Sequence, residues 1–291
     1  MISNIGENLK FIEAPNKARP PHSNSLLIDD DIKVLIDCAC GDSNIELLQK
    51  KGIDIIISSH FHIDHTMNNY KFPSAEIWAH EDDAPAIQSL NCYRDYLGFH
   101  ELSEGKVWEE YARTYDIHPT PIKRKLYDGE SLDFGKNRLK VIHTPGHTPG
   151  HCCFLINDAQ LFSAEIDARL FGPWYGHLCS NIDDFIESVE LCIEIKPAAL
   201  ITSHNGIIRD NIEQRLQKFL DVIYEREEKL LKALKKPSTI EELTHLHIFY
   251  GPVRTFNEFR RVTEKAAITL HLQRLLKAEK ITRYGQLYYV Q

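Results

Sequence analysis

The sequence lacks the features that mark membrane-spanning and secreted proteins. None of its apolar runs approaches the ~20 residues that a membrane-spanning helix needs. Residues 1–7 have neither a basic start nor an apolar core, so we expect no secretory signal. Seven cysteines, an odd number without a Cys-x-x-Cys pair, argue against a disulfide framework and favour reduced, buried thiols. These absences predict a cytoplasmic protein that has no contact with a membrane.

Positive charge is scarce in the first part of the chain. Residues 1–208 carry 18 Lys and Arg against 31 Asp and Glu, whereas residues 209–291 carry 16 against 11. We therefore expect two parts with different surfaces. The acidic first part argues against a broad nucleic-acid groove there, because such grooves are lined by Lys and Arg.

Side chains that bind metals are concentrated in one short stretch. Three imidazoles and one carboxylate fall within six residues, namely His60, His62, Asp64 and His65. The stretch follows Ile53–Ser58, a β-branched apolar run that predicts a buried strand. Ligand sites in α/β sheets lie at strand ends, and imidazole with carboxylate suits zinc, iron or manganese. The stretch therefore predicts a transition-metal site.

The pattern His-x-His-x-Asp-His resembles the signature of the metallo-β-lactamase fold superfamily. Three later stretches resemble further motifs of that family in the expected order, namely Thr144–His151, Leu161–Asp167 and Ala198–Gly206. The resemblance covers residues 9–208 and implies an α/β fold, an αββα sandwich. It indicates a metal more strongly than a substrate, since one fold hosts many chemistries.

The resemblance implies a dinuclear centre with two sets of ligands. These are His60, His62 and His147 for one metal, and Asp64, His65 and His204 for the other. Two divalent ions are expected, zinc foremost, with iron or manganese as alternatives. Asp37 matches a family aspartate that fixes a ligand histidine by a hydrogen bond, although a strand-end or helix-capping role fits its sequence context equally well.

The residue that would bridge the two metals departs from the family pattern. Glu165 stands where the family has the aspartate of a Gly-Asp pair, and Ala164 stands where it has the glycine. Asp167 follows two residues later and would share a face with Glu165 if the strand continued. Register favours Glu165 as the bridge, with Asp167 as the alternative. A third alternative is that neither binds and the site holds one metal.

An aromatic loop, Phe171–His177, follows the bridging segment. Tyr175 or His177 in this loop could donate a hydrogen bond to a substrate, and we take Tyr175 as the candidate proton donor to the leaving group. The resemblance gives Asp64 a second role, which is to orient the attacking water.

Two further segments differ from the rest in composition. Residues 81–125 are helical, aromatic and charged in pattern and predict an insertion that caps the active site, with a peripheral helical pair or a dimer contact as the alternative. Residues 209–291 predict helices followed by a hairpin, and they resemble a winged-helix module. This C-terminal domain could bind nucleic acid, or it could cover or dimerise the catalytic domain of residues 1–208.

Together these features predict a metal-dependent hydrolase. A metal-bridging hydroxide would attack a small ester, thioester or lactone, as in glyoxalase II and the acyl-homoserine lactonases, which the Thr-Pro-Gly-His-Thr-Pro-Gly-His stretch resembles. The acidic first part and the aromatic insertion favour a small, partly apolar substrate. The alternatives are an endoribonuclease or other phosphodiesterase of the same superfamily, or a nucleic-acid- or protein-binding module with a degenerate metal site. A homodimer is one expected assembly.

Overall fold

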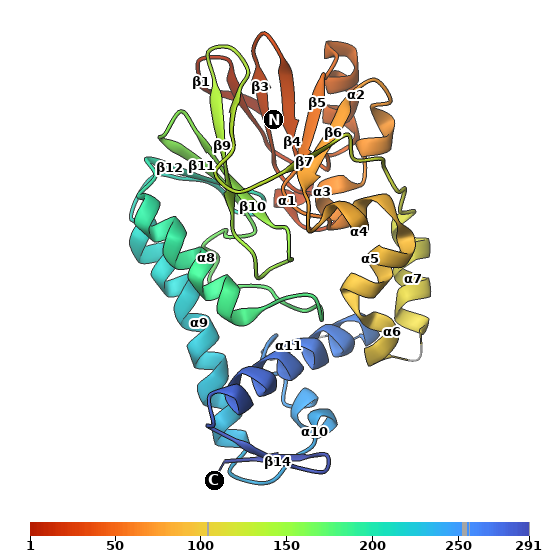
Figure 1. Ribbon diagram of the computed structural model, residues 1–291, viewed down its shortest axis with the longest axis vertical. Coiled ribbons are helices and arrows are strands. Elements are labelled where there is room, and N and C mark those ends of the chain that lie inside the picture. The colour runs from red at the N-terminus through yellow and green to blue at the C-terminus, as the bar shows by residue number, and fades with distance from the viewer. Residues whose placement is uncertain (104, 252–254, 256, 291) are drawn as a thin grey trace.

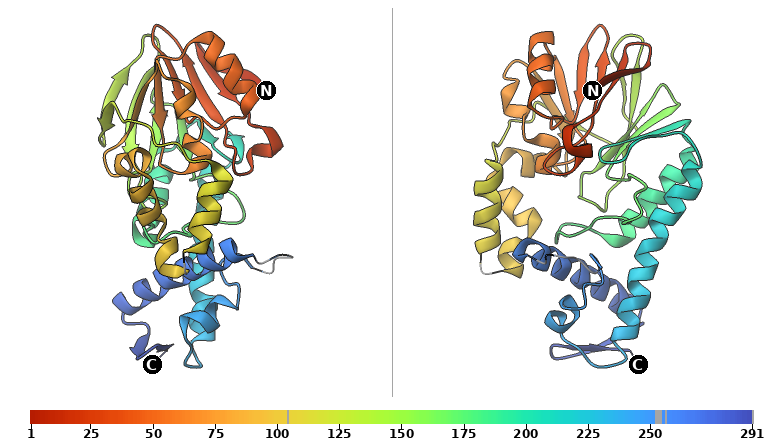
Figure 2. Two further views of the ribbon diagram at one scale, coloured as in Figure 1. Left: turned by 90° about the vertical axis from the view of Figure 1, so that its right-hand side faces the viewer. Right: turned by 180° about the vertical axis from the view of Figure 1, so that it is seen from behind.

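The structure is a computed structural model that describes residues 1–103, 105–251, 255 and 257–290 of the 291-residue chain. Two β-sheets pack face to face in the upper part of the molecule, and helices flank them and extend below (Figure 1). The lower part is formed by the C-terminal segment and by the helices that follow β6 (Figure 2).

The first sheet has seven strands in sequence order. They are β1 (Ile2–Gly6), β2 (Leu9–Ile12), β3 (Ser25–Asp29), β4 (Lys33–Ile36), β5 (Ile55–Ser58), β6 (Glu76–His80) and β7 (Arg124–Leu126). The pairs are antiparallel from β1 to β4 and parallel from β4 to β7. The predicted hairpin around Asp29–Asp31 is confirmed, since β3 and β4 pair across it.

The second sheet has six strands in the order β13-β12-β11-β10-β9-β8. They are β8 (Ser131–Asp133), β9 (Arg138–His143), β10 (Cys152–Ile156), β11 (Gln160–Ala164), β12 (Ala199–Thr202) and β13 (Gly206–Ile208). Only β11 and β12 pair in parallel; the other neighbours are antiparallel. The segments that leave β9, β11 and β12 carry His147, Glu165 and His204, the three predicted ligands from this half of the chain.

The core lies between the two sheets, where the inward-facing side chains alternate along the strands. Leu26 of the first sheet and Phe154 and Phe162 of the second are fully buried in this layer. On the outer face of the first sheet, α2 (Asp42–Lys51) packs Ile45 and Leu48. On the outer face of the second sheet, α8 (Ile182–Ile195) and α9 (Ile212–Ala233) pack their apolar side chains into one cluster with the sheet. The expected αββα sandwich is therefore confirmed.

The segment between β6 and β7 is helical, as predicted for residues 81–125. It contains α4 (Ala84–Gln88), α5 (Leu90–Leu97), α6 (Phe99–Leu102) and α7 (Lys106–Tyr115). These helices share one apolar cluster with Phe61 of the histidine-rich stretch and with Val262 of α11 (Glu258–Lys277). Three shorter elements complete this half of the chain, namely α1 (Pro15–Ala18), α3 (Ile63–Thr66) and the 3₁₀ helix η1 (Asn69–Lys71).

The C-terminal segment begins on the sandwich and ends away from it. The long helix α9 runs down from the second sheet, and α11 crosses back beneath the sandwich toward α6 and α7 (Figure 2). Between them lies α10 (Ile240–Thr244), whose N-terminus has a capping box formed by Thr239 and Glu242. A hairpin of β14 (Thr282–Tyr284) and β15 (Leu287–Tyr289) follows α11.

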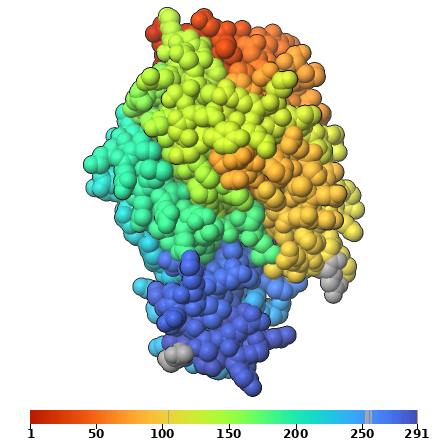
Figure 3. All heavy atoms as spheres, viewed as in Figure 1, coloured from red at the N-terminus to blue at the C-terminus, as the bar shows by residue number. Residues whose placement is uncertain are grey.

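This segment is packed against the rest of the molecule. In the space-filling view the C-terminal residues meet both residues near 180 and the helices that follow β6 (Figure 3). Phe249, Ala267 and Leu270 belong to the same apolar cluster as α8 and the second sheet. Within the described ranges, no helix is both long and apolar enough to cross a membrane.

Replacing Phe154 by alanine tests the inter-sheet core. The ring is fully buried opposite Phe162 and Val141 of the neighbouring strands, so Phe154→Ala is expected to lower the free energy of unfolding by about 3–5 kcal/mol. Chemical denaturation measures the change. Leu170→Ala is the matched control, because Leu170 is 92% exposed and its loss should change the unfolding free energy by less than ~0.5 kcal/mol. Equal effects of the two substitutions would contradict this packing.

Candidate metal centre

Three predicted ligand histidines meet at one buried point below the strand ends. His60 Nε2 lies 3.1 Å from His62 Nδ1, and His147 Nε2 lies 3.2 Å and 2.9 Å from these two nitrogens. All three rings are buried. These nitrogens come close enough together to hold one metal ion, and we call this group the three-histidine cluster.

Local backbone geometry explains why these rings converge. His60 follows β5, and His62 is the extended residue that caps the N-terminus of α3. His147 sits in the loop after β9, where Gly146 has a φ of +122° and a Cβ there would lie 2.3 Å from the backbone nitrogen of Phe185. Only glycine fits this position, so the loop can press closely against α8 and direct His147 to the centre.

A second group of ligands lies beside the first. His204 Nε2 lies 2.8 Å from Glu165 Oε1 and 3.4 Å from Asp64 Oδ2, and His65 Nε2 lies 3.1 Å from Glu165 Oε1. We call these four residues the carboxylate cluster. Their ligand atoms also come close enough together to hold one ion. The residues far apart in sequence that were predicted to meet, His60 and His65 with His147 and His204, therefore do so.

Partners outside the two clusters fix the ring orientations. His65 Nδ1 donates to Asp37 Oδ2 at 2.7 Å, and the other oxygen of Asp37 accepts the backbone N–H of Ser59. The geometry thus supplies the hydrogen bond expected for Asp37. His147 Nδ1 donates to the carbonyl of Trp174 at 2.8 Å, and His204 Nδ1 donates to that of Ala18 at 2.5 Å.

These outer hydrogen bonds determine which ring nitrogens carry a proton. A neutral imidazole has one N–H, so His65, His147 and His204, which each donate through Nδ1, present an unprotonated Nε2 to the centre. Those lone pairs face each other or face carboxylate oxygens, and such contacts are repulsive unless a cation lies between them. The donor set therefore fits a bound cation, and nitrogen with carboxylate oxygen is the set that zinc, iron and manganese accept.

The electrostatics of the two clusters differ. Burial, reinforced by the neighbouring histidines, holds the pKa of His60 and His62 well below the usual range, so both are neutral ligands. Burial also acts to lower the pKa of His65, but the charges of Asp37 and Asp64 outweigh it and raise that pKa to about 10. The carboxylate cluster thus has a strong affinity for positive charge, which a proton or a metal ion can satisfy.

The structure separates the two candidates for the bridging carboxylate. β11 ends at Ala164, which has a left-handed φ of +46°, so Glu165 follows directly on a turn and enters the carboxylate cluster. The strand alternation that would have placed Asp167 on the same face as Glu165 is wrong, because the strand has already ended. Asp167 instead pairs with the side chain of Arg169.

The predicted catalytic role of Tyr175 does not fit its position. Its hydroxyl is fully buried and lies 2.9 Å from both His271 Nε2 and Arg226 Nη1. Tyr175 joins the aromatic loop to α9 and α11, away from the pocket over the metal ligands. It is therefore a packing residue, and the loop presents its neighbours Trp174 and His177 to the pocket instead.

A pocket of about 400 Å³ opens over both clusters. Its wall is mainly aromatic and comes from several separate segments, namely Tyr111 and Tyr115 of α7, Phe171 and Trp174 of the loop, and Tyr250 and Phe259 of the C-terminal segment. Two guanidinium groups, those of Arg169 and Arg260, also line it. Sequence analysis did not identify the C-terminal contributors, because only packing of α11 against α6 and α7 brings them to the site.

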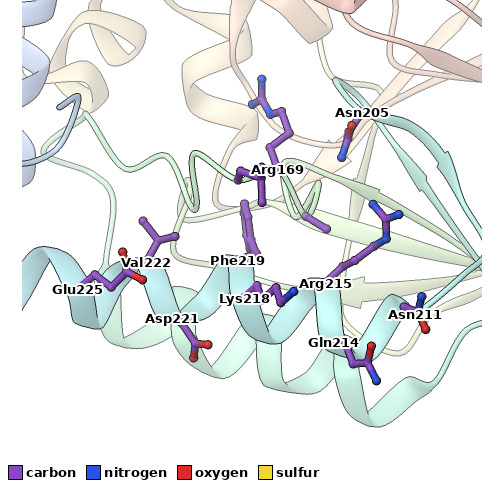
Figure 4. Close-up of a pocket in the computed structure, with 12 residues that line it drawn as sticks. Arg169, Asn205, Asn211, Gln214, Arg215, Lys218, Phe219, Asp221, Val222 and Glu225 are labelled. Carbon is purple, nitrogen blue, oxygen red and sulfur yellow. The ribbon is translucent and has the colours of Figure 1, made fainter. Parts of the chain in front are cut away.

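A second, larger groove of about 780 Å³ lies between residues 168–170 and α9. Figure 4 shows the side chain of Arg215 rising from α9 toward Asn205. Arg169 lines both this groove and the pocket over the metal ligands. Arg169 is therefore the residue that the linings of the two hollows have in common.

A third histidine group, near the start of α4, does not offer a comparable centre. His80 and His143 stack at 3.9 Å beside Asp82. His143 Nε2 donates to the carbonyl of Pro149, and His80 Nδ1 accepts the backbone N–H of Asp82. If both rings are neutral, only one imidazole lone pair in this group is then unused, which is too few to hold an ion as the other two clusters could.

Comparison with known proteins agrees with this geometry. The family model described as the metallo-beta-lactamase superfamily matches residues 18–204. A solved structure from Thermus thermophilus, that of the metallo-beta-lactamase family protein TTHA1429, superposes with a TM-score of 0.75 at 22% identity over 99% of this chain and all of that one.

Curated relatives match over shorter regions. The atrochrysone carboxyl ACP thioesterase of Aspergillus fumigatus is 24% identical over 124 residues, which are 42% of this chain and 37% of the relative. The human acyl-coenzyme A thioesterase MBLAC2 is 27% identical over 154 residues, 50% of this chain and 53% of the relative. The chain thus spans about half or less of the length of these two relatives.

The fold, the order of the ligand motifs and the family match agree. The chain belongs to the metallo-beta-lactamase superfamily.

Replacing Asp37 tests the support of the carboxylate cluster. Asp37→Asn keeps the shape but can present an N–H to His65 Nδ1, which would disturb the tautomer that leaves Nε2 free. We expect zinc affinity to fall ~10–100-fold, as is typical when an outer partner of a ligand is lost. A competitive chelator titration measures the change. Asp54→Asn, on a carboxylate that bonds the backbone of Lys33, is the control and should leave the affinity unchanged. Equal affinities of Asp37→Asn and the unmodified protein would contradict the assigned role.

The raised pKa of His65 predicts how the metal-free protein responds to pH. The pKa of His65 is about 10 in the folded state and about 6.5, its ordinary value, in the unfolded state. The stabilisation that comes from protonating His65 is therefore complete below pH 6.5. That stabilisation is lost as the pH rises toward 10. The unfolding midpoint of chelator-treated protein should therefore fall over this interval. Zinc-loaded protein should not show this loss, because Nε2 then binds the ion. A flat profile for the metal-free protein would contradict the assigned electrostatics.

Proposed function

We propose that this protein is a metal-dependent hydrolase with a dinuclear centre that cleaves thioesters, esters or lactones of modest size, thioesters foremost. One observation carries the proposal: two adjacent clusters of imidazole nitrogens and carboxylates lie at the floor of an aromatic pocket. The similarity to an ACP thioesterase and to an acyl-coenzyme A thioesterase supports the preference for thioesters.

In this proposal the three-histidine cluster would hold one divalent ion and the carboxylate cluster, which includes Glu165, would hold the other. When bound, such ions act as Lewis acids and make hydroxide available near neutral pH. Zinc is the first choice, with iron or manganese as alternatives, because all three accept imidazole and carboxylate ligands.

The side chains of this chain then have distinct tasks. Although burial opposes ionisation, His65 and His204 lower the pKa of Asp64, so this carboxylate is charged and can accept a hydrogen bond from an attacking water. Asp37, Trp174 and Ala18 keep the ligand rings in the tautomers that the centre needs. The aromatic wall excludes water and offers apolar surface to an acyl group.

The two arginines indicate what else the substrate carries. Arg169 and Arg260 line the same pocket, and a guanidinium is suited to carboxylate and phosphate groups. A substrate with an acyl part against the aromatic side chains and an anionic part near the arginines would use both features.

Two sets of contacts argue against a nucleic-acid substrate held by the C-terminal segment. In a winged-helix module the helix before the hairpin enters the groove of DNA. Here the corresponding helix, α11, buries Val262, Ala266 and Leu270 within the protein. Arg274, a basic residue in the last turn of this helix, already pairs with Asp183 and Glu227. We infer that this segment completes the pocket instead.

Turnover by metal-loaded protein tests the proposed function. Protein reconstituted with zinc, iron(II) or manganese is assayed with S-acyl thioesters of increasing chain length, a lactone, a p-nitrophenyl ester and an RNA oligonucleotide. We expect the metal-loaded protein to hydrolyse thioesters. His62→Ala should lower the rate by more than ~100-fold, the upper cost of losing a residue that only hydrogen-bonds a ligand, because His62 is itself a ligand. His118→Ala, on a partly exposed histidine outside both clusters, should retain full activity. Cleavage of RNA without thioester turnover would overturn the proposal in favour of a phosphodiesterase.

A further inference from the structure

A sixth imidazole, that of His177, lies beside the five histidines of the two clusters without belonging to either. His177 Nδ1 is 2.9 Å from His62 Nε2. The ring is 97% buried and lies edge-on to Trp174 at 4.7 Å and to Phe99 at 5.2 Å between ring centroids. His177 also lines the pocket over the centre.

The protonation of His177 follows from that of its neighbour. His62 directs Nδ1 to the three-histidine cluster and Nε2 to His177, so as a metal ligand it is unprotonated at Nδ1 and carries its single N–H on Nε2. That N–H donates to His177 Nδ1. Since His177 then accepts at Nδ1, a neutral His177 must carry its own proton on Nε2.

This Nε2 has no hydrogen-bond partner among the residues that the structure describes, although it is buried. A buried donor without a partner costs roughly 1–3 kcal/mol, so a ligand atom that accepted its hydrogen would be stabilised there. The Nδ1 edge is occupied by His62, and the ring lines the pocket. The remaining edge carries this unpartnered N–H, and the ring that bears it lines the pocket over the metal ligands.

We propose that His177 Nε2–H is a catalytic hydrogen-bond donor that stabilises the negative charge developing on the reacting acyl group. The inference rests on the proposed hydrolase function. No proton is transferred in this role: the water–acyl bond forms and the bond to the leaving group breaks while His177 stays neutral. Trp174 and Phe99 hold the ring in place, so little reorganisation is needed during the reaction.

Two substitutions separate a donor from a packing residue. His177→Phe keeps an aromatic ring against Trp174 and Phe99 but removes the N–H, whereas His177→Gln retains an N–H donor of similar reach. With the best thioester substrate, we expect His177→Phe to lower kcat by ~10²–10³-fold, the usual cost of losing one such donor, with little change in KM. His177→Gln should recover at least a tenth of the original kcat. Zinc content should remain that of the unmodified protein in both.

The tautomer gives a second measurement that does not depend on activity. Nitrogen-15 NMR of the zinc-loaded protein should show His177 protonated at Nε2 and unprotonated at Nδ1. Three results would overturn the proposal: the opposite tautomer, equal kcat for the Phe and Gln variants, or loss of zinc in both, which would mean that His177 acts only by holding His62. Absence of thioester turnover in the unmodified protein would instead refute the proposed hydrolase function. The two failures can be told apart, because the NMR measurement of the tautomer does not depend on turnover.

Discussion

The structure depends on a concentration of unprotonated nitrogen and carboxylate oxygen that only a cation can satisfy. Seven ligand side chains converge in two adjacent clusters, and their outward-facing atoms are already hydrogen-bonded to Asp37, Trp174 and Ala18. What remains at the centre is lone pair against lone pair and lone pair against negative charge. In a buried site such contacts are costly, so the sandwich holds these groups in a geometry that a bound cation, or in part a proton on His65, would stabilise.

The two sheets make this arrangement rigid. Each ligand follows the end of a buried strand or belongs to the short helix after β5, and the parallel pairs β4–β5 and β11–β12 bring the strand ends of each sheet to one edge. Close packing then fixes the loops, as at Gly146, where the backbone meets α8 without room for a side chain. Precision at the centre thus comes from the core rather than from the loops themselves.

Much of the centre could be predicted from sequence because its ligands stand in local patterns. The His60–His65 stretch is recognisable by its density of ligand side chains, and His147 by the Pro and Gly residues that flank it. His204 is recognisable because it follows an apolar strand. Register alone favoured Glu165 over Asp167 as the bridge, and the structure places Glu165, directly after the end of β11, in the carboxylate cluster. Sequence could not reveal that end, because the left-handed residue is Ala164 rather than a glycine. Nor could it tell which residues of the loop around Tyr175 face inward, since both orientations keep the aromatic side chains buried.

The pocket wall was the least predictable part. Phe259 and Arg260 lie more than fifty residues beyond His204 and carry no motif; they reach the site only because α9 leads the chain away and α11 returns it. The prediction that residues 81–125 and the C-terminal segment could cover the site followed from composition, and Tyr111, Tyr115 and Tyr250 now give it specific contacts. The winged-helix resemblance rested on the order of helices and hairpin in this segment. The burial of α11 within the protein instead indicates that the segment packs against the catalytic domain.

The central claim is that both clusters hold a transition-metal ion at the same time. The most direct test is the metal content of the purified protein by mass spectrometry, compared with that of His147→Ala and His204→Ala. The account predicts two ions per chain in the unmodified protein and one fewer in each variant, because each loses a ligand from a different cluster. Protein that holds no transition metal, even after incubation with zinc, iron(II) and manganese, would contradict it.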